Sequence, residues 1–239
     1  MERLDPGLLL GAYSVGVFPM ADDRDADSVF WVEPPQRAVL PLDGFHLSRS
    51  LRKTLAADRF RVTADQAFDA VLALCAEAAP DRPNTWINAS IAEAFHRLHC
   101  LGRAHSVECW LGDRLVGGLY GLALGRAFFG ESMVSRATDA SKVAIAWLVA
   151  RLRVGGFTLL DCQFQPAHLA SLGAVEIPRA ADLASLAEAL AGAVGCASVG
   201  AAAAAAGDFR ALDGPGWRST SVSGPVAGKD IVQLLTQTS

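Results

Sequence analysis

The sequence lacks the features that mark several large classes of protein. Its five cysteines, at positions 75, 100, 109, 162 and 196, form no CxxC pair and are odd in number. This pattern argues against a disulfide framework and favours a reducing environment such as the cytoplasm. The motifs GxSxG, GxxxxGK[ST] and GxGxxG are also missing. The sequence therefore gives no support to a nucleophile-elbow hydrolase or to a glycine-rich nucleotide cradle.

A long hydrophobic run is missing as well. The apolar run 8–18 follows Glu2 and Asp5, has no small-residue cleavage site and ends in Phe18-Pro19. It therefore reads as a core helix rather than a signal peptide. No apolar stretch reaches the roughly 18 residues that a membrane span needs. We expect no membrane partner.

The chain has no overall excess of positive charge. It holds 21 Lys and Arg against 25 Asp and Glu, a formal net charge of −4, which argues against a protein that coats nucleic acid through its total charge. One local exception lies in residues 45–61, where Asp58 is the only acid. A solvated helix face is the default interpretation of this segment, and a grip on a phosphate backbone is the alternative. Its basic residues are Arg49, Arg52, Lys53, Arg59 and Arg61, of which the first three share a helix face.

What is present points to a folded α+β protein. With 239 residues, 51% of them hydrophobic, the chain can build one large or two small domains. Apolar spacing predicts helices over 7–17, 46–57, 64–78, 89–101, 139–154, 167–172 and 181–194. It predicts strands over 31–42 (interrupted by two prolines), 59–63, 104–111, 114–124, 125–131, 157–163 and 174–177. The pattern favours a largely antiparallel sheet with alternating helices.

The C-terminal residues 197–239 differ from the rest in composition. They are rich in Ala, Gly and Ser, which predicts a linker or a loosely docked tail. The apolar group 231–235 could dock as a short helix.

Two carboxylates and an amide are the candidate chemical groups. Asp161 follows a run of residues typical of a buried strand, so its carboxylate needs a partner. The alternative is an ordinary polar residue at the end of a strand. Strand alternation predicts that Asp161 and Gln163 face the same way and that Cys162 faces the other. The second carboxylate is Glu131. These groups beside Phe128 suit a site that holds an amine and an apolar side chain.

The strand before Glu131 leaves one choice open. Regular strand alternation places Phe129 on the same face as Glu131, whereas a β-bulge at Gly130 would place Phe128 on that face instead.

The histidines carry less information. His96 and His99, beside Cys100, have a spacing that resembles that of metal ligands on a helix. The sequence holds no second ligand pair with suitable spacing, so we expect no metal. We expect His168, just past the Asp161 strand, to neighbour the active site.

Many ordered blocks of this sequence resemble the leucyl/phenylalanyl-tRNA–protein transferase family, from about residue 7 to about residue 180. The densest matches are Phe129-Gly-Glu-Ser-Met133, Ala140-Ser-Lys142 and Asp161-Cys-Gln163. Further matches are Gly16-Val-Phe-Pro19, Pro35-Gln-Arg-Ala-Val-Leu40, His46-Leu-Ser-Arg-Ser50, Thr85-Trp-Ile87, Ala104-His-Ser106 and Ile177-Pro-Arg179.

The resemblance implies an abbreviated N-terminal α/β domain over 1–44 and a GNAT-like acyltransferase domain over 45–196. It implies transfer of leucine or phenylalanine, and less well methionine, from aminoacyl-tRNA to an N-terminal arginine or lysine of a protein. This transfer marks the protein for degradation. It further implies a cytoplasmic enzyme that uses no cofactor, and we expect a monomer.

The resemblance also assigns roles to residues of this chain. Asp161 and Gln163 correspond to the catalytic pair that positions the attacking amine, and Glu131 to the acid near the aminoacyl amine. The positions that correspond to the side-chain pocket and the tRNA 3′-end site are Met20, Trp86, Leu119, Phe128, Ser132 and Leu160. Those that correspond to contacts with the tRNA acceptor stem are Arg49, Arg52 and Lys53.

The sequence departs from the family pattern at a few positions. Met20 stands where a tryptophan is common, and a thioether offers no ring face for stacking. Two basic positions of the helix over 46–57 are Ala56 and Ala57 here.

Two other functions remain as alternatives. An N-acetyltransferase that uses acyl-CoA would want a glycine-rich loop at 135–142, which has no glycine. The other is an inactive, RNA-binding relative, against which the intact Glu131, Asp161 and Gln163 argue.

Overall fold

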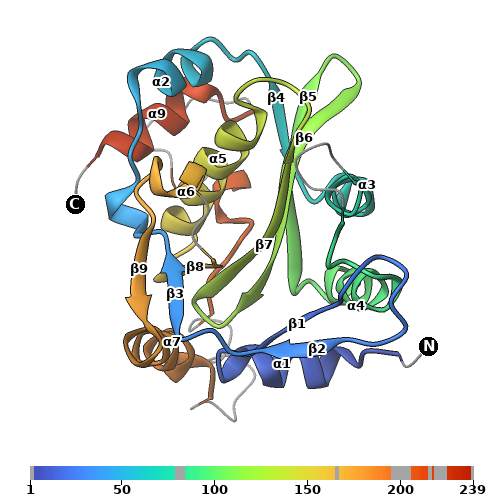
Figure 1. Cartoon of the computed structure of the whole chain (residues 1–239). Coiled ribbons are helices and arrows are strands. Elements are labelled where there is room, and N and C mark those ends of the chain that lie inside the picture. Colours follow the sequence, from blue (N-terminus) through green and yellow to red (C-terminus); the bar gives the residue numbers. More distant parts are fainter. Residues whose placement is uncertain are drawn as a thin grey trace.

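The structure, a computed structural model, is built on one seven-stranded sheet (Figure 1). Its strands, in spatial order, are β4 (Arg61–Ala64), β5 (Ala104–Leu111), β6 (Arg114–Leu124), β7 (Ala127–Ser135), β8 (Leu159–Gln163), β3 (Gln36–Val39) and β9 (Val175–Pro178). All neighbours are antiparallel except β7 and β8, which are parallel. The prediction of an α+β chain with a largely antiparallel sheet is confirmed. The residues described are 3–78, 84–164, 167–194, 206–214, 217 and 225–237.

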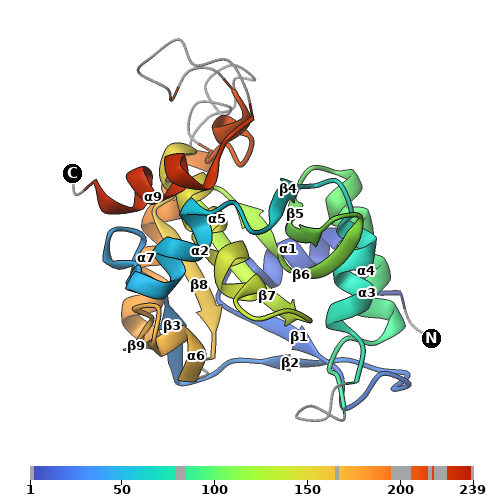
Figure 2. The same cartoon turned by 90° about the horizontal axis from the view of Figure 1, so that it is seen from above.

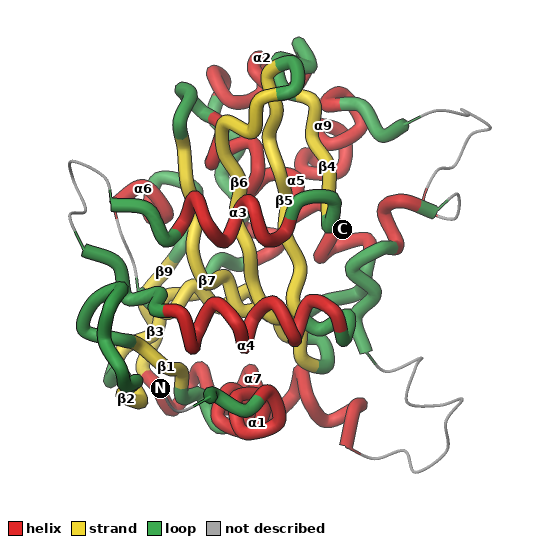
Figure 3. Tube along the Cα trace, turned by 90° about the vertical axis from the view of Figure 1, so that its right-hand side faces the viewer, coloured by secondary structure: helices red, strands yellow, loops and turns green. Residues whose placement is uncertain are grey.

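Helices cover both faces of the sheet, and each face has its own apolar core. One face carries α2 (Arg49–Ala56), α5 (Ala140–Val154) and α9 (Gly228–Thr236), which pack against one another. The other carries α1 (Pro6–Ser14), α3 (Phe68–Cys75), α4 (Ala89–Cys100) and α7 (Arg179–Val194). Figure 2 shows α2, α5 and α9 on one side of β5 and β6 and α3 and α4 on the other, and Figure 3 shows α3 and α4 lying across the sheet.

Local sequence signals set the helix starts. The side chains of Asp5, Ser48 and Asn88 each accept a hydrogen bond from a backbone N–H in the first turn of α1, α2 and α4. Such caps satisfy donors that the helix itself leaves free. Helix α5 begins without such a cap. Asp139 precedes that helix with a φ of 71° and makes no capping hydrogen bond.

The strand predictions are confirmed where the periodicity is regular and fail where the chain turns. Strands β5 and β6 have the predicted bounds, and Gly112 turns between them with a φ of +57°. The predicted strand 31–42 is in fact divided at its two prolines. Its first part becomes β2 (Phe30–Val32), which pairs with β1 (Phe18–Met20) in a separate two-stranded sheet, and its second part becomes β3. Because proline donates no ladder hydrogen bond, the division falls there.

The described parts of the C-terminal region are packed, contrary to the expected loose tail. Phe209 and Leu212 are buried, and Arg151 of α5 binds the Asp213 carboxylate with both Nη atoms at 2.6 and 2.8 Å. The prediction that 231–235 docks as a helix is confirmed by α9. Residues 195–205 lie outside the described ranges, and the boundaries of the predicted domains stay a prediction.

Two local irregularities open the centre of the sheet. Strands β7 and β8 pair at only three positions, the last being Phe129 with Asp161, although β7 continues to Ser135. Between β6 and β7 the register shifts, because Tyr120 faces Ser132 while Gly121 faces Gly130. Glu131 is thus the extra residue of a β-bulge, a device that redirects side chains.

The bulge makes a prediction about Gly121. A Cβ there would clash with the Phe129 carbonyl oxygen and the Phe128 ring. Gly121→Ala should therefore lower the free energy of unfolding by about 1–3 kcal/mol, measured by urea denaturation. The matched control is Gly11→Ala in α1, where a Cβ meets nothing within 4 Å and a change from no effect to about 1 kcal/mol of stabilisation is expected. Equal effects of the two substitutions would contradict the assigned bulge.

Candidate active site

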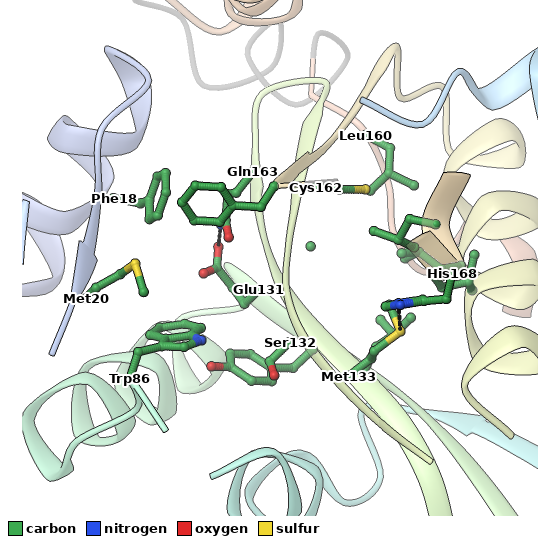
Figure 4. A pocket seen from close by; sticks show the side chains of 17 residues that line it. Phe18, Met20, Trp86, Glu131, Ser132, Met133, Leu160, Cys162, Gln163 and His168 are labelled. Carbon is green, nitrogen blue, oxygen red and sulfur yellow. Dashed lines mark hydrogen bonds between the residues drawn. The ribbon is translucent and has the colours of Figure 1, made fainter. Parts of the chain in front are cut away.

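A pocket of about 280 Å³ lies where β7 and β8 part (Figure 4). It is lined from both faces of the sheet, by α5 on one side and by β1 on the other, so it occupies the gap between the two strands. The lining residues are Phe18, Met20, Trp86, Leu119, Tyr120, Gly130, Glu131, Ser132, Met133, Ile145, Leu148, Leu160, Cys162, Gln163, Phe164, His168 and Leu169.

Most of the predicted site residues meet in this pocket. They are Met20, Trp86, Leu119, Glu131, Ser132, Leu160 and Gln163, and the expected neighbour His168 joins them. The wall is mainly apolar and suits an aliphatic or aromatic side chain. Two predicted residues, Asp161 and Phe128, do not line the pocket.

Asp161 lies behind the pocket rather than in it. Leu160 and Cys162 line the cavity from the side of α5. Asp161 does not line the cavity, and 0% of its surface is exposed. Gln163 reaches the cavity from the side of Glu131, and its φ of +61° ends the regular strand. Cys162 packs against the core under α5, whereas Gln163 binds Glu131 and Asp161 binds Arg37 beside Phe18, which belongs to the core on the other face. The prediction that Asp161 and Gln163 share a face opposite Cys162 agrees with these contacts.

Phe128 is part of the core. Its ring is fully buried, with Phe157 edge-on at 6.3 Å and Phe209 stacked at 5.7 Å. The bulge that could have brought it to the cleft exists, but it redirects Glu131 and leaves Phe128 facing the apolar layer under α5. Phe129, the other candidate, is equally buried and lies against Tyr13.

Glu131 and Gln163 form the polar centre of the pocket. Gln163 Nε2 donates to Glu131 Oε1 at 3.0 Å, across the gap between the strands. Among the described residues, Glu131 Oε2 has no partner in hydrogen-bond geometry. Burial raises the pKa of Glu131 to about 8, and nearby Asp161 adds to the rise, whereas Tyr13, Gln163 and Arg37 oppose it. The site thus holds a carboxyl group that changes its charge near neutral pH.

A buried ion cluster lies directly behind this pair, and sequence reasoning did not find it. Arg37 of β3 binds Asp161 through Nη2, and its Nε lies 3.7 Å from an Asp182 carboxylate oxygen on α7. All three side chains are at most 1% exposed. Burial raises the pKa of Asp161 despite Arg37, and it raises the pKa of Asp182 to about 6. One signal was available, since an arginine followed by Ala-Val-Leu within a strand has no obvious exposed face.

The remaining candidates lie apart from the pocket. Arg49, Arg52 and Lys53 are exposed on α2. His96 contacts Asp69, and His99 contacts the Ala104 carbonyl oxygen. In the described ranges, no three His, Cys, Asp or Glu side chains gather in a way that could hold a metal ion. None of the described helices has both the length and the apolarity to cross a membrane.

Comparison with known protein families gives two matches. The model of the leucyl/phenylalanyl-tRNA protein transferase family matches residues 39–187, and the model of the N-terminal domain of the same family matches residues 2–35. Together they cover most of the chain.

Curated relatives carry the name leucyl/phenylalanyl-tRNA–protein transferase. The protein of Rhizorhabdus wittichii is 60% identical over the full length of both chains. That of Novosphingobium aromaticivorans is 51% identical over 100% of this chain and 98% of its own. That of Zymomonas mobilis is 64% identical over 74% of this chain and 66% of its own.

Solved structures add little. L-PGS from Bacillus licheniformis aligns with a TM-score of 0.40 and 10% identity, over 65% of this chain and 51% of its own. A similarity this low supports no conclusion, and it does not confirm the GNAT-like description.

The raised pKa of Glu131 predicts a pH dependence of stability. Between pH 4.5 and about 8 the folded state keeps a proton that the unfolded state has lost, so the free energy of unfolding should fall as the pH rises. Glu131→Gln removes this contribution, so the free energy of unfolding of the variant should fall less steeply over this pH range. The slopes of the two proteins should differ by up to about 1.4 kcal/mol per pH unit. Urea denaturation of both proteins at several pH values measures the difference. Parallel stability curves for the two proteins across this range would disprove the raised pKa.

Proposed function

The chain belongs to the leucyl/phenylalanyl-tRNA protein transferase family, and we propose that it transfers leucine or phenylalanine, and less well methionine, from aminoacyl-tRNA to the α-amino group of an N-terminal arginine or lysine. The product carries an N-terminus that marks it for degradation. The observation that supports this proposal most is the apolar pocket with the Glu131–Gln163 pair at its centre. The GNAT-like description of the fold belongs to the same proposal and rests on the sequence resemblance alone.

The proposed reaction needs little chemical catalysis by side chains of the protein. The attacking α-amine forms an amide bond with the aminoacyl carbonyl carbon, and the ester bond to the ribose oxygen breaks. The amine loses one proton and the ribose oxygen gains one, so the exchange is balanced. Because the ester is already activated, holding the two substrates in the right geometry supplies most of the acceleration.

We assign the pocket wall to the side chain of the transferred amino acid and to the 3′ end of the tRNA. Trp86, Leu119 and Leu160 provide its apolar surface, with Met20 and Ser132 beside them. Glu131 Oε2 faces the amine of the aminoacyl group. A carboxyl with a pKa of about 8 is well matched to an α-amine, whose pKa is also about 8.

Gln163 orients the attacking amine from the opposite side of the gap. Its amide is fixed by Glu131, and its backbone N–H donates to Asp161 Oδ1 at 2.7 Å. Asp161 belongs to the catalytic pair as the residue that holds Gln163. Its second oxygen is occupied by Arg37, which argues against a direct role as the base.

Helix α2 is the proposed contact for the acceptor stem of the tRNA. Its basic side chains are exposed, and the helix packs on α5, which supplies Ile145 and Leu148 to the pocket wall. Phosphate contacts of this kind position a nucleic acid without reading its sequence. The acyl-CoA alternative has less support, because residues 135–142 provide no glycine-rich turn for a pyrophosphate.

The proposed activity predicts a selective transfer. Labelled leucyl-tRNA or phenylalanyl-tRNA, incubated with the protein and a peptide, should label peptides that begin with Arg or Lys. Peptides that begin with Asp or Glu, identical in the rest of their sequence, should stay unlabelled. Labelling of only the acidic peptides would indicate a transferase of another specificity, and labelling of none would refute the activity.

The basic helix predicts a salt-dependent defect. Replacing Arg49, Arg52 and Lys53 together by Ala should raise the KM for aminoacyl-tRNA and leave kcat nearly unchanged, because the pocket is intact. The slope of log affinity against log salt concentration should become shallower by about one for each lost phosphate contact. Arg103→Ala, which removes an exposed arginine after α4, serves as the control. An effect of equal size in the control would mean that total charge matters rather than α2.

A further inference from the structure

Arg37 is the largest of the fully buried side chains among the described residues. It lies on β3, with its guanidinium 4.9 Å from the Phe18 ring centre and bound to Asp161. Its Nε and Nη1 atoms, and both Asp182 carboxylate oxygens, have no partner in hydrogen-bond geometry among the described residues. Such a cluster costs desolvation energy, and apolar residues of similar volume are often as stable or more stable. Its presence calls for a reason beyond stability.

Holding the strands together is not that reason. The backbone already joins β3 to β8, where Ala38 faces Gln163 and Val39 faces Asp161. The Leu40 N–H adds a hydrogen bond to the Leu160 carbonyl oxygen at 2.9 Å. The ion pair is therefore redundant for pairing.

A chain of contacts runs instead from Arg37 to the pocket. Arg37 fixes one oxygen of Asp161, and the other oxygen accepts the Gln163 backbone N–H at 2.7 Å. That hydrogen bond stabilises Gln163 at a φ of +61°, a conformation that is unfavourable for a residue other than glycine. The same turn directs the Gln163 amide to Glu131.

We propose that Arg37 is a positioning residue, which fixes the Asp161 carboxylate so that Asp161 holds the strained turn at Gln163 and thereby sets the Glu131–Gln163 pair in the pocket. This inference rests on the proposed function for its kinetic test. It assigns Arg37 no contact with substrate.

The proposal requires Arg37 and Asp161 to act as a unit. Arg37→Gln and Asp161→Asn should each lower kcat by roughly 100-fold, the size of loss that follows misplacement of reacting groups. The double variant should be about as slow as the slower single variant. The KM for aminoacyl-tRNA should change little in all three, since α2 is untouched. Losses that multiply in the double variant would overturn the proposal.

The pH profile separates positioning from a folding defect. Asp161 raises the pKa of Glu131 and Arg37 lowers it. Removal of the Arg37 charge should therefore shift the pH limb, the pH range over which kcat/KM changes with the charge of Glu131, to higher pH. Removal of the Asp161 charge should shift it to lower pH. A smaller folded fraction lowers the amplitude of the profile without moving it. The titratable groups that surround the Glu131–Gln163 pair are Tyr13 of α1, Tyr120 of β6, Cys162 of β8 and His168 of α6 (Ala167–Ala170).

Two further variants keep the test decisive if Arg37→Gln does not fold. Arg37→Lys retains the charge but not the two-pronged geometry, so its pH limb should stay in place while kcat falls. Asp182→Asn is the matched control, because it removes the other carboxylate beside Arg37, whereas the hydrogen bonds of Gln163 go to Asp161 and Glu131. Its kcat should remain within a few-fold of the wild type. A normal kcat in Arg37→Lys, or an equal loss in Asp182→Asn, would overturn the proposal.

The assay uses labelled leucyl-tRNA and a peptide that begins with Arg. A wild-type protein that transfers nothing would refute the proposed function. A wild-type protein that transfers normally, with variants whose losses multiply and whose pH limbs stay fixed, would refute only the role of Arg37.

Discussion

The site depends on the point at which β7 and β8 stop pairing. Parallel strands normally extend their ladder as far as both strands run, but here the ladder ends at Phe129 and Asp161. The bulge at Glu131 turns β7, and the left-handed residue Gln163 ends β8. One side-chain hydrogen bond, from Gln163 to Glu131, then spans the gap that the backbone leaves open. The pocket walls follow from this separation, because residues from both faces of the sheet can reach the same cavity.

Burial decides the electrostatics of this gap. Glu131, Asp161 and Asp182 are shielded from water, and Arg37 is the cation that the structure places among them. Burial raises the pKa values of all three carboxyl groups, and the Arg37 guanidinium offsets this rise only in part. Of the three carboxyl groups, Glu131 is the one that lines the pocket. The cluster therefore favours a carboxyl that can exchange a proton near neutral pH, as a reaction of amines requires.

Sequence periodicity predicts the elements better than it predicts the orientation of individual side chains. It places β5, β6 and α5 within a residue, because their apolar spacing is long and regular. Glu131 and Gln163 are brought to one cleft by reasoning from the strands, and most of the wall residues by the family resemblance. Periodicity does not predict that Asp161 stays outside the pocket, because the Arg37 side chain that binds Asp161 comes from another strand. No sequence signal marks a positive φ at a glutamine. Periodicity misses Arg37 because that contact joins residues 124 positions apart.

The proposed separation of tRNA binding at α2 from the reaction at Glu131 depends on the packing of α5. This helix is buried along most of its length, and it contacts the pocket, α2 and α9 at once. Arg151 and Arg153 near its end bind Asp213 and the Leu234 carbonyl oxygen, which ties the C-terminal residues to the same helix. A rigid central helix thus fixes the distance between the exposed basic side chains of α2 and the reacting groups. If α2 binds the acceptor stem, the packing of α5 determines how far the tRNA 3′ end must reach to place its ester beside Glu131.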